Sequence, residues 1–168
     1  GLILGIKSDA LSSFVNHLSQ EILEINPSCM LHPNIKKGYN SNKEKVVSQN
    51  NVVITANYES DVENNYAQQG IVSVDGKTFL ENNTLHLEVF GPFSMVVQCE
   101  NSDELEQVIA SLEGQLTGTV ISDNDEISNY HLSNLNFHFP TVSKTYNEDD
   151  NNGFAKQYSK KYGATPNK

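Results

Sequence analysis

The sequence SMVVQCENSDELEQVIASLEGQLTGTVI, residues 94–121, decides the fold class of this 168-residue chain. Residues 94–99 have the apolar, β-branched character of a buried strand, and residues 116–121 form a second such run. Ser102 is predicted to cap the helix between them. Four apolar residues at helical spacing form the stripe of that helix: Leu105, Val108, Ile109 and Leu112. We therefore predict an α/β fold, in which the two strands are parallel and joined by a right-handed βαβ crossover.

The residues before this unit add elements that fit such a sheet. Strands are predicted at residues 2–6, 52–55 and 71–74, and Asp75 with Gly76 is predicted to form a turn. A first helix is expected after an N-cap at Ser8 or Asp9. Its apolar face repeats at helical spacing: Leu11, Phe14, Val15, Leu18, Ile22 and Ile25. A second helix is expected over roughly residues 35–47. Together these elements predict a partly parallel sheet with packed helices.

Composition excludes several classes of function. The formal charge is −10, with 11 Lys and no Arg, so nucleic acid and anionic membranes would repel the chain. No apolar run is long enough to cross a membrane, and we expect a cytoplasmic protein. Cys29 and Cys99 have no neighbouring ligand at metal-binding spacing. Both are predicted to be buried thiols, so we predict no metal site.

One short segment is a candidate binding site. Residues 87–92 read LEVFGP, and in an extended segment residues two apart face the same side. Glu88 and Phe90 are therefore predicted to point together into one space, where a carboxylate can accept hydrogen bonds from a sugar diol and a ring can pack beside a flat heterocycle. The alternative is a buried phenylalanine beside a surface glutamate, and composition alone favours that alternative.

Several motifs in the same order resemble the aldehyde dehydrogenase superfamily. EVFGP at residues 88–92 is similar to a motif of that superfamily, and FLENNTLH at residues 79–86 resembles the segment leading into it. EGQLT at residues 113–117 resembles the NADP-linked branch that includes α-ketoglutarate semialdehyde dehydrogenases. GLIL at residues 1–4 and the pattern across residues 30–39 agree with the same branch. The resemblance covers residues 1 to about 126.

The resemblance implies roles for the candidate residues. Glu88 matches the glutamate that binds the hydroxyls of the nicotinamide ribose, and Phe90 matches the phenylalanine beside the nicotinamide ring. Leu87 stands where many members carry a second acid. The implied activity is NADP-dependent oxidation of an aldehyde to a carboxylic acid. The implied nucleophilic cysteine lies just upstream of Gly1, so we expect a partial, inactive enzyme segment with no catalytic residue of its own.

The rest of the chain, residues 127–168, is predicted to be a tail of different origin. Residues 136–168 resemble part of a type I periplasmic ligand-binding protein, with a strand at residues 137–140 and a short amphipathic helix over residues 154–162. A natural truncation, a gene fusion, a composite gene or an engineered chimera could each join two such pieces. The alternative function is a non-catalytic solute-binding or interaction module. Self-association through unpaired sheet edges is a further expectation.

Overall fold

The computed structural model describes residues 1–57, 63–113, 115–121, 137–145 and 156–159. The chain divides into two units, Gly1–Leu105 and Glu106–Lys168, and each is described by itself. The sequence also predicts a helix end at Gly114 and a polar break at residues 123–126, and both lie outside the described residues.

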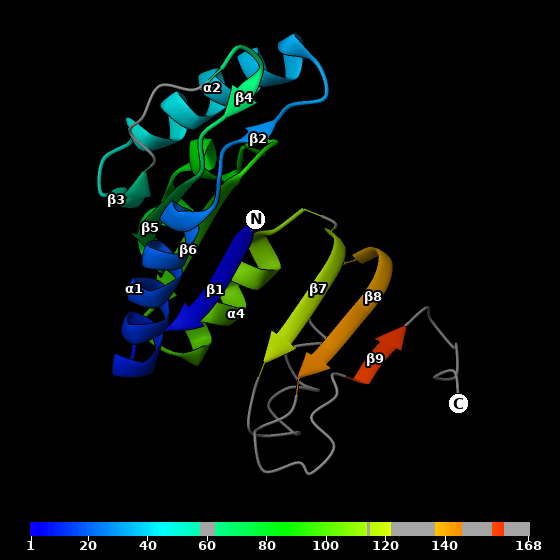
Figure 1. Ribbon diagram of the computed structural model, residues 1–168. Coiled ribbons are helices and arrows are strands. Elements are labelled where there is room, and N and C mark those ends of the chain that lie inside the picture. Colours follow the sequence, from blue (N-terminus) through cyan, green and yellow to red (C-terminus); the bar gives the residue numbers. More distant parts are fainter. Residues whose placement is uncertain (58–62, 114, 122–136, 146–155, 160–168) are drawn as a thin grey trace. The chain divides into compact units, whose positions relative to one another are not determined.

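The first unit is built on a four-stranded sheet in the order β1-β6-β5-β3 (Figure 1). β1 (Leu2–Ile6), β5 (Gly70–Asp75) and β6 (Phe93–Cys99) are parallel, whereas β3 (Val53–Asn57) runs antiparallel to β5. The central strand β6 carries Val96 and Val97, which are both fully buried. Because successive strand residues face opposite sides, both faces of the sheet must be covered. The predicted α/β fold with a partly parallel sheet is confirmed.

Helices cover the two faces of this sheet. α1 (Asp9–Glu24) begins after Ser8, the first of the two predicted caps, whose Oγ accepts a hydrogen bond of 3.1 Å from Leu11 N. Val15 on α1 packs in one buried cluster with Ile71 and Val96. Val72, the neighbour of Ile71, points to the opposite face. There it lines a cavity together with residues of α2 (Pro33–Val47).

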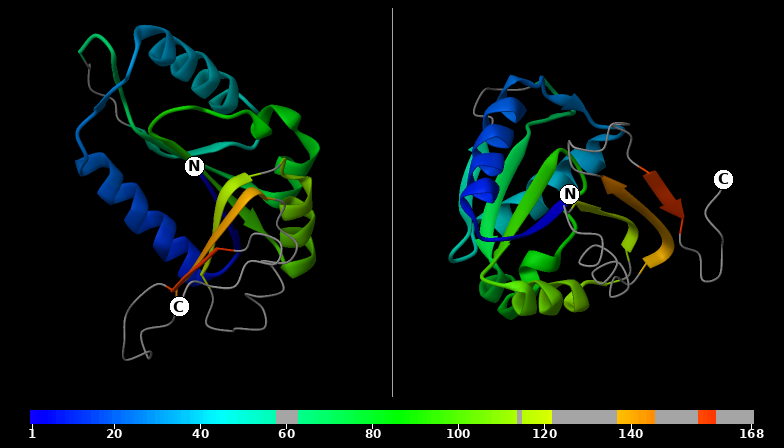
Figure 2. Two further views of the ribbon diagram at one scale, coloured as in Figure 1. Left: turned by 90° about the vertical axis from the view of Figure 1, so that its right-hand side faces the viewer. Right: turned by 90° about the horizontal axis from the view of Figure 1, so that it is seen from below.

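Shorter elements complete the first unit. α3 (Gly76–Glu81) and the 3-10 helix η1 (Asn83–His86) connect β5 to β6, and α1 and α3 lie on opposite sides of the sheet (Figure 2). A small second sheet pairs β2 (Ser28–Cys29) with β4 (Tyr66–Ala67). α4 (Ser102–Ser111) follows β6, and the boundary between the two units falls within it, after Leu105. Self-association through the edge strands β1 and β3 stays a prediction.

The predicted crossover over residues 94–121 is wrong. β6 is hydrogen-bonded to β1 on one side and to β5 on the other, so neither of its edges is available to the next strand, β7 (Gln115–Ile121). β7 instead pairs in parallel with β8 (Phe137–Thr145). The crossover between adjacent parallel strands runs from β5 through α3 and η1 to β6. Periodicity identified the elements, but it carries no information about which edges pair.

Two predicted boundaries also change. Asp75 does not form a simple turn with Gly76 but caps α3, since its carboxylate accepts a hydrogen bond of 2.8 Å from Thr78 N. At the start of α4 the capping side chain is Asn101 rather than Ser102. Its Oδ1 accepts a hydrogen bond of 3.0 Å from Glu104 N. In both cases a short polar side chain satisfies a free amide of the first helical turn.

The second unit contains a three-stranded sheet in the order β7-β8-β9. β8 is longer than the strand predicted at residues 137–140. β9 (Lys156–Ser159) runs antiparallel to β8, so the helix predicted over residues 154–162 is wrong there. A short helix is marginal in water, whereas pairing with β8 satisfies the backbone of β9. The different origin predicted for residues 127–168 stays a prediction, and β7 and β8 share one sheet across that boundary.

Among the described residues, no helix combines the length and the apolar character needed to cross a membrane.

Candidate functional site

The predicted site residues lie on the connection between η1 and β6. Val89 is 9% exposed and anchors this connection, whereas Phe90 is 64% exposed and Glu88 is exposed as well. The side chains on either side of Val89 are therefore both presented to solvent. The alternative of a buried phenylalanine is wrong for Phe90.

Gly91 gives the connection its sharp bend. Its φ of +154° is a conformation that residues with a side chain rarely adopt. A Cβ atom at this position would lie 2.4 Å from Cδ2 of Tyr39. Glycine is therefore required here for two reasons, the backbone angle and the close approach of a buried ring.

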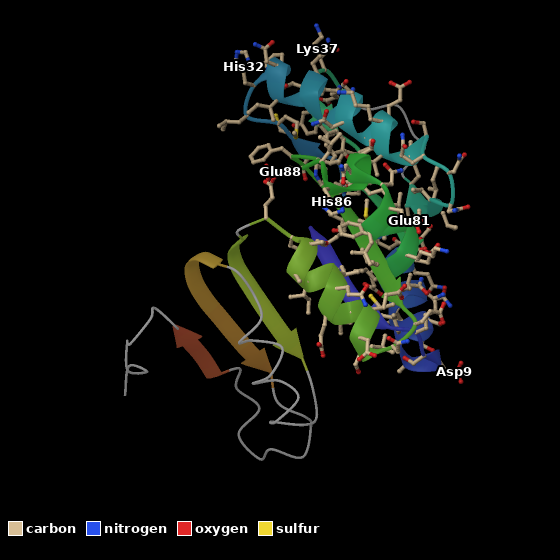
Figure 3. All side chains as sticks on the ribbon, turned by 180° about the vertical axis from the view of Figure 1, so that it is seen from behind. Asp9, His32, Lys37, Glu81, His86 and Glu88 are labelled. Carbon is tan, nitrogen blue, oxygen red and sulfur yellow. The ribbon has the colours of Figure 1, made fainter. Side chains whose placement is uncertain are left out.

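Helix α2 contacts the same connection through two side chains. The Tyr39 hydroxyl donates its single proton mainly to the carbonyl of Gln68 and shares it, at 3.4 Å, with the carbonyl of Pro92. Asn42 Nδ2 donates to the carbonyl of Glu88 at 3.1 Å, and Figure 3 shows Glu88 on the side of the unit next to α2. Burial raises the pKa of Tyr39 to about 12, so its hydroxyl remains a donor at neutral pH. Sequence reasoning assigned no role to either residue, since neither is charged or part of a recognisable catalytic pattern.

Glu88 lies near the amino end of β1. The backbone nitrogen of Gly1 donates a hydrogen bond of 2.6 Å to the carbonyl of Phe93, just after the connection. The Glu88 carboxylate lies close enough to the Gly1 nitrogen to interact with it electrostatically. An exposed carboxylate, an exposed ring and the start of a parallel strand are thus gathered at one end of the sheet.

A cavity of about 340 Å³ lies elsewhere, between α2 and the β3–β5 edge of the sheet. Its lining includes Tyr39, Lys43 and Asn57, but neither Glu88 nor Phe90. Lys43 Nζ donates to Asn57 Oδ1 at 2.8 Å, and burial lowers the pKa of Lys43. Tyr39 therefore separates this cavity from the connection that carries the predicted site residues.

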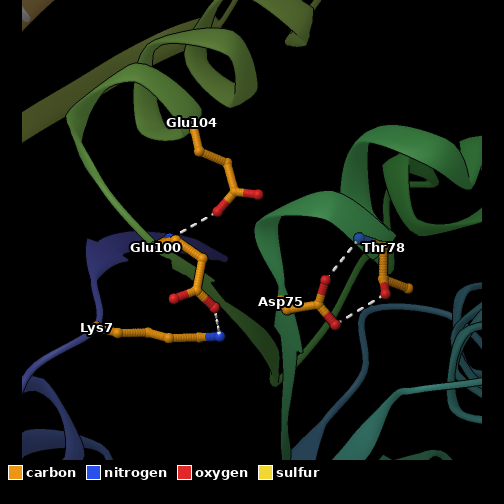
Figure 4. Close-up of polar contacts among 5 residues, drawn as sticks. All are labelled: Lys7, Asp75, Thr78, Glu100 and Glu104. Carbon is orange, nitrogen blue, oxygen red and sulfur yellow. Dashed lines mark hydrogen bonds and ion pairs between the residues drawn. The ribbon is translucent and has the colours of Figure 1, made fainter.

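A polar cluster occupies the opposite end of the parallel strands (Figure 4). Lys7 and Glu100 form an ion pair, and the Glu104 carboxylate accepts a hydrogen bond of 2.6 Å from Glu100 N. Burial raises the pKa of Asp75, but hydrogen bonds from Thr78 outweigh burial and hold that pKa below its usual value. The cap on α3 therefore stabilises the fold at pH values above the usual carboxyl pKa, and this stabilisation is lost as the pH falls through the lowered pKa of Asp75. These contacts join and cap elements, which is a structural role.

Comparison with known proteins identifies the segment. The chain is 30% identical over 128 residues to an alpha-ketoglutaric semialdehyde dehydrogenase of Acinetobacter baylyi, covering 76% of this chain and 24% of the relative. It is 30% identical over 126 residues to alpha-ketoglutaric semialdehyde dehydrogenase 2 of Azospirillum brasilense, covering 75% and 24%. The matched segment belongs to the aldehyde dehydrogenase superfamily. The chain spans about a quarter of the length of these curated relatives, and no family model matches it.

Solved aldehyde dehydrogenases share the fold of this segment. A Bacillus cereus aldehyde dehydrogenase superposes with a TM-score of 0.71 and 12% identity, covering 94% of this chain and 33% of that chain. The glyceraldehyde-3-phosphate dehydrogenase GapN of Methanocaldococcus jannaschii, solved with NADP, superposes with a TM-score of 0.67 and 17% identity. This match covers 84% of this chain and 31% of that chain. These structures show a shared fold, and the curated relatives favour the aldehyde dehydrogenase interpretation over the solute-binding alternative.

The two cysteines of this aldehyde dehydrogenase segment differ from each other. Cys99 is fully buried at the end of β6, and burial raises its pKa to about 11. Cys29 is exposed on the two-residue strand β2, so the prediction that both thiols are buried is wrong for Cys29. In the described residues no group of three or more His, Cys, Asp and Glu side chains could hold a metal ion.

We expect the two thiols to react at very different rates. A thiolate is the reacting species, so a buried thiol of raised pKa is protected twice. With Ellman's reagent at pH 8, the folded chain should release colour rapidly from Cys29 alone, and Cys99 should react only after denaturation. Cys29→Ser should abolish the rapid phase. A rapid phase that survives Cys29→Ser would contradict the burial of Cys99.

Proposed function

We propose that this chain is the segment of an NADP-dependent semialdehyde dehydrogenase that positions the nicotinamide end of the cofactor through Glu88 and Phe90. One observation carries the proposal. Val89 is buried while Glu88 and Phe90 are exposed on either side of it, close to the amino end of β1.

The exposed side chains suit the group that they would hold. A carboxylate accepts hydrogen bonds from both hydroxyls of a ribose more strongly than a neutral group does. The Phe90 ring is 64% exposed, which leaves an apolar surface against which a flat heterocycle can pack. The chemistry that NADP supplies is the acceptance of a hydride from the aldehyde carbon. The contribution of this segment is orientation, on which such a transfer depends steeply.

The proposal includes the absence of activity in the chain alone. The resemblance implies that the nucleophilic cysteine of the superfamily precedes the residue matched by Gly1. Cys99 does not replace it, since it is buried at the far end of β6, and Cys29 lies on β2, outside the sheet that carries the site. Loss of a nucleophile costs several orders of magnitude in turnover.

Two measurements test the proposal. The chain, mixed with NADP and α-ketoglutarate semialdehyde, should form no NADPH above blank and show no NADP binding by calorimetry. Grafted in place of the matched segment of the Acinetobacter baylyi relative, residues 1–126 should support NADPH formation. A graft that folds cooperatively by circular dichroism yet forms no NADPH would contradict the proposal. So would turnover by the chain alone that Cys29→Ala or Cys99→Ala abolishes.

A further inference from the structure

We propose that helix α2 rigidifies the connection between β5 and β6, and that Tyr39 and Asn42 are positioning residues that fix Glu88 and Phe90. The functional consequence rests on the proposed function above. The rigidifying role of α2 itself is inferred only from contacts within the first unit.

The contacts follow one another in a consistent antiparallel order. From the start of α2 onward, Tyr39 contacts Pro92 and Asn42 contacts Glu88. Just beyond the helix, Gln49 Oε1 accepts a hydrogen bond of 3.0 Å from Asn82 Nδ2. Asn51 Nδ2 then donates to Thr78 Oγ1 at 3.3 Å. Residue numbers rise along α2 and its end while they fall along the connection, so the helix lies alongside the connection from α3 to the start of β6.

Tyr39 holds the end of the connection that enters the sheet. It is 2% exposed, and its ring lies against Gly91, where a Cβ atom would be 2.4 Å from Cδ2. Its hydroxyl joins the carbonyls of Gln68 and Pro92. The Pro92 carbonyl also accepts a hydrogen bond of 3.0 Å from Gly70 N on β5. Tyr39 therefore ties the bend after Phe90 to the strand next to β6.

Asn42 holds the other end. It lies three residues after Tyr39, so both side chains are on one face of the helix. Its donation to the Glu88 carbonyl sets the plane of the peptide between Glu88 and Val89. The direction of the Glu88 side chain depends on that plane. No helix or strand holds residues 87–92, so beside the burial of Val89 and the backbone hydrogen bond at Pro92, these side-chain contacts help to set the direction of Glu88 and Phe90.

The decisive experiment removes the Asn42 donor without removing its bulk. In the full chain, Asn42→Asp keeps the shape but cannot donate, and Asn42→Gln restores an amide donor. Asn40→Asp is the matched control, since it makes the same charge change at an exposed position of the same helix. Backbone order parameters from ¹⁵N relaxation are measured for Val89, Phe90 and Gly91. They report motion of the connection directly.

The rigidifying role of α2 predicts a specific pattern of order parameters. Order parameters near 0.85 should fall below roughly 0.6 at these three amides in Asn42→Asp, while the amides of β6 and α2 stay unchanged. Asn42→Gln should recover most of the loss, and Asn40→Asp should show none. If Asn42→Asp does not fold, Asn42→Ala removes the donor without adding charge and should give the same loosening. Unchanged order in a folded Asn42 variant lacking the donor would overturn the proposal.

This test is independent of the cofactor. Loss of order in Asn42→Asp together with an inactive graft would contradict the proposed function but support the rigidifying role of α2. Unchanged order together with an active graft would contradict only the rigidifying role of α2. In an active graft, Tyr39→Phe and Asn42→Asp should lower kcat and raise the KM for NADP, and Asn42→Gln should restore both.

Discussion

Gly91→Ala is expected to lower the free energy of unfolding by roughly 2–5 kcal/mol. The backbone at Gly91 has a φ of +154°, which costs a residue with a side chain about 1–3 kcal/mol. The added methyl would also lie 2.4 Å from Cδ2 of Tyr39 and 2.9 Å from Cε2. Tyr39 is 2% exposed and its hydroxyl is committed to two carbonyls, so the ring cannot move aside without losing those bonds. Urea denaturation followed by circular dichroism measures the effect.

The chain offers a matched control for this substitution. Gly38 lies inside α2, and a Cβ atom there would meet nothing within 4 Å. Gly38→Ala should therefore stabilise the chain by about 0.5–1 kcal/mol, the usual gain inside a helix. A cycle with Tyr39→Leu separates the two causes, because the smaller side chain relieves the clash and leaves only the backbone strain. Equal costs of Gly91→Ala in both backgrounds would show that the ring plays no part.

The sequence identified elements well and their partners poorly. Apolar periodicity found α1 and its cap at Ser8, since both signals lie within a few neighbouring residues. The pairing of β7 with β8 rather than β6 depends on which sheet edges are already occupied, and no local pattern records that. The strand at Lys156–Ser159 was missed for the same reason, because its backbone is satisfied by a distant partner.

In the candidate site, too, local features could be predicted from the sequence, whereas contacts between distant residues could not. Glu88 and Phe90 were predicted from a motif, and both side chains are exposed, while their shared direction and ligand contact stay predictions. Tyr39 and Asn42 were not predicted, because their contacts reach 53 and 46 residues along the chain. The motif thus singled out two exposed side chains, whereas the contacts of Tyr39 and Asn42 with this connection become visible only in the fold.

Glu88→Gln is expected to weaken cofactor contact by about 1–3 kcal/mol in an active graft of residues 1–126. The change keeps the size of the side chain and removes the charge that strengthens its acceptance of two ribose hydroxyls. This corresponds to a loss of roughly 5- to 150-fold in kcat/KM for NADP. Because ring placement governs the transfer step, part of the loss should appear in kcat and not only in KM. Steady-state NADPH formation at varied NADP measures both.

Two matched controls separate site contact from general damage. Glu81→Gln makes the same chemical change at an exposed residue of α3, where only an ion pair of 4.0 Å to Lys77 is lost, and such surface pairs contribute little. Phe14→Leu, at an exposed ring of α1, is the control for Phe90→Leu. Phe90→Leu should slow the hydride step, so the isotope effect with a deuterated aldehyde should rise, whereas both controls should leave rate and isotope effect unchanged. If Glu88→Gln and Phe90→Leu behave like their controls, the cofactor does not contact this connection, because a carboxylate and a ring that touch it cannot be replaced without cost.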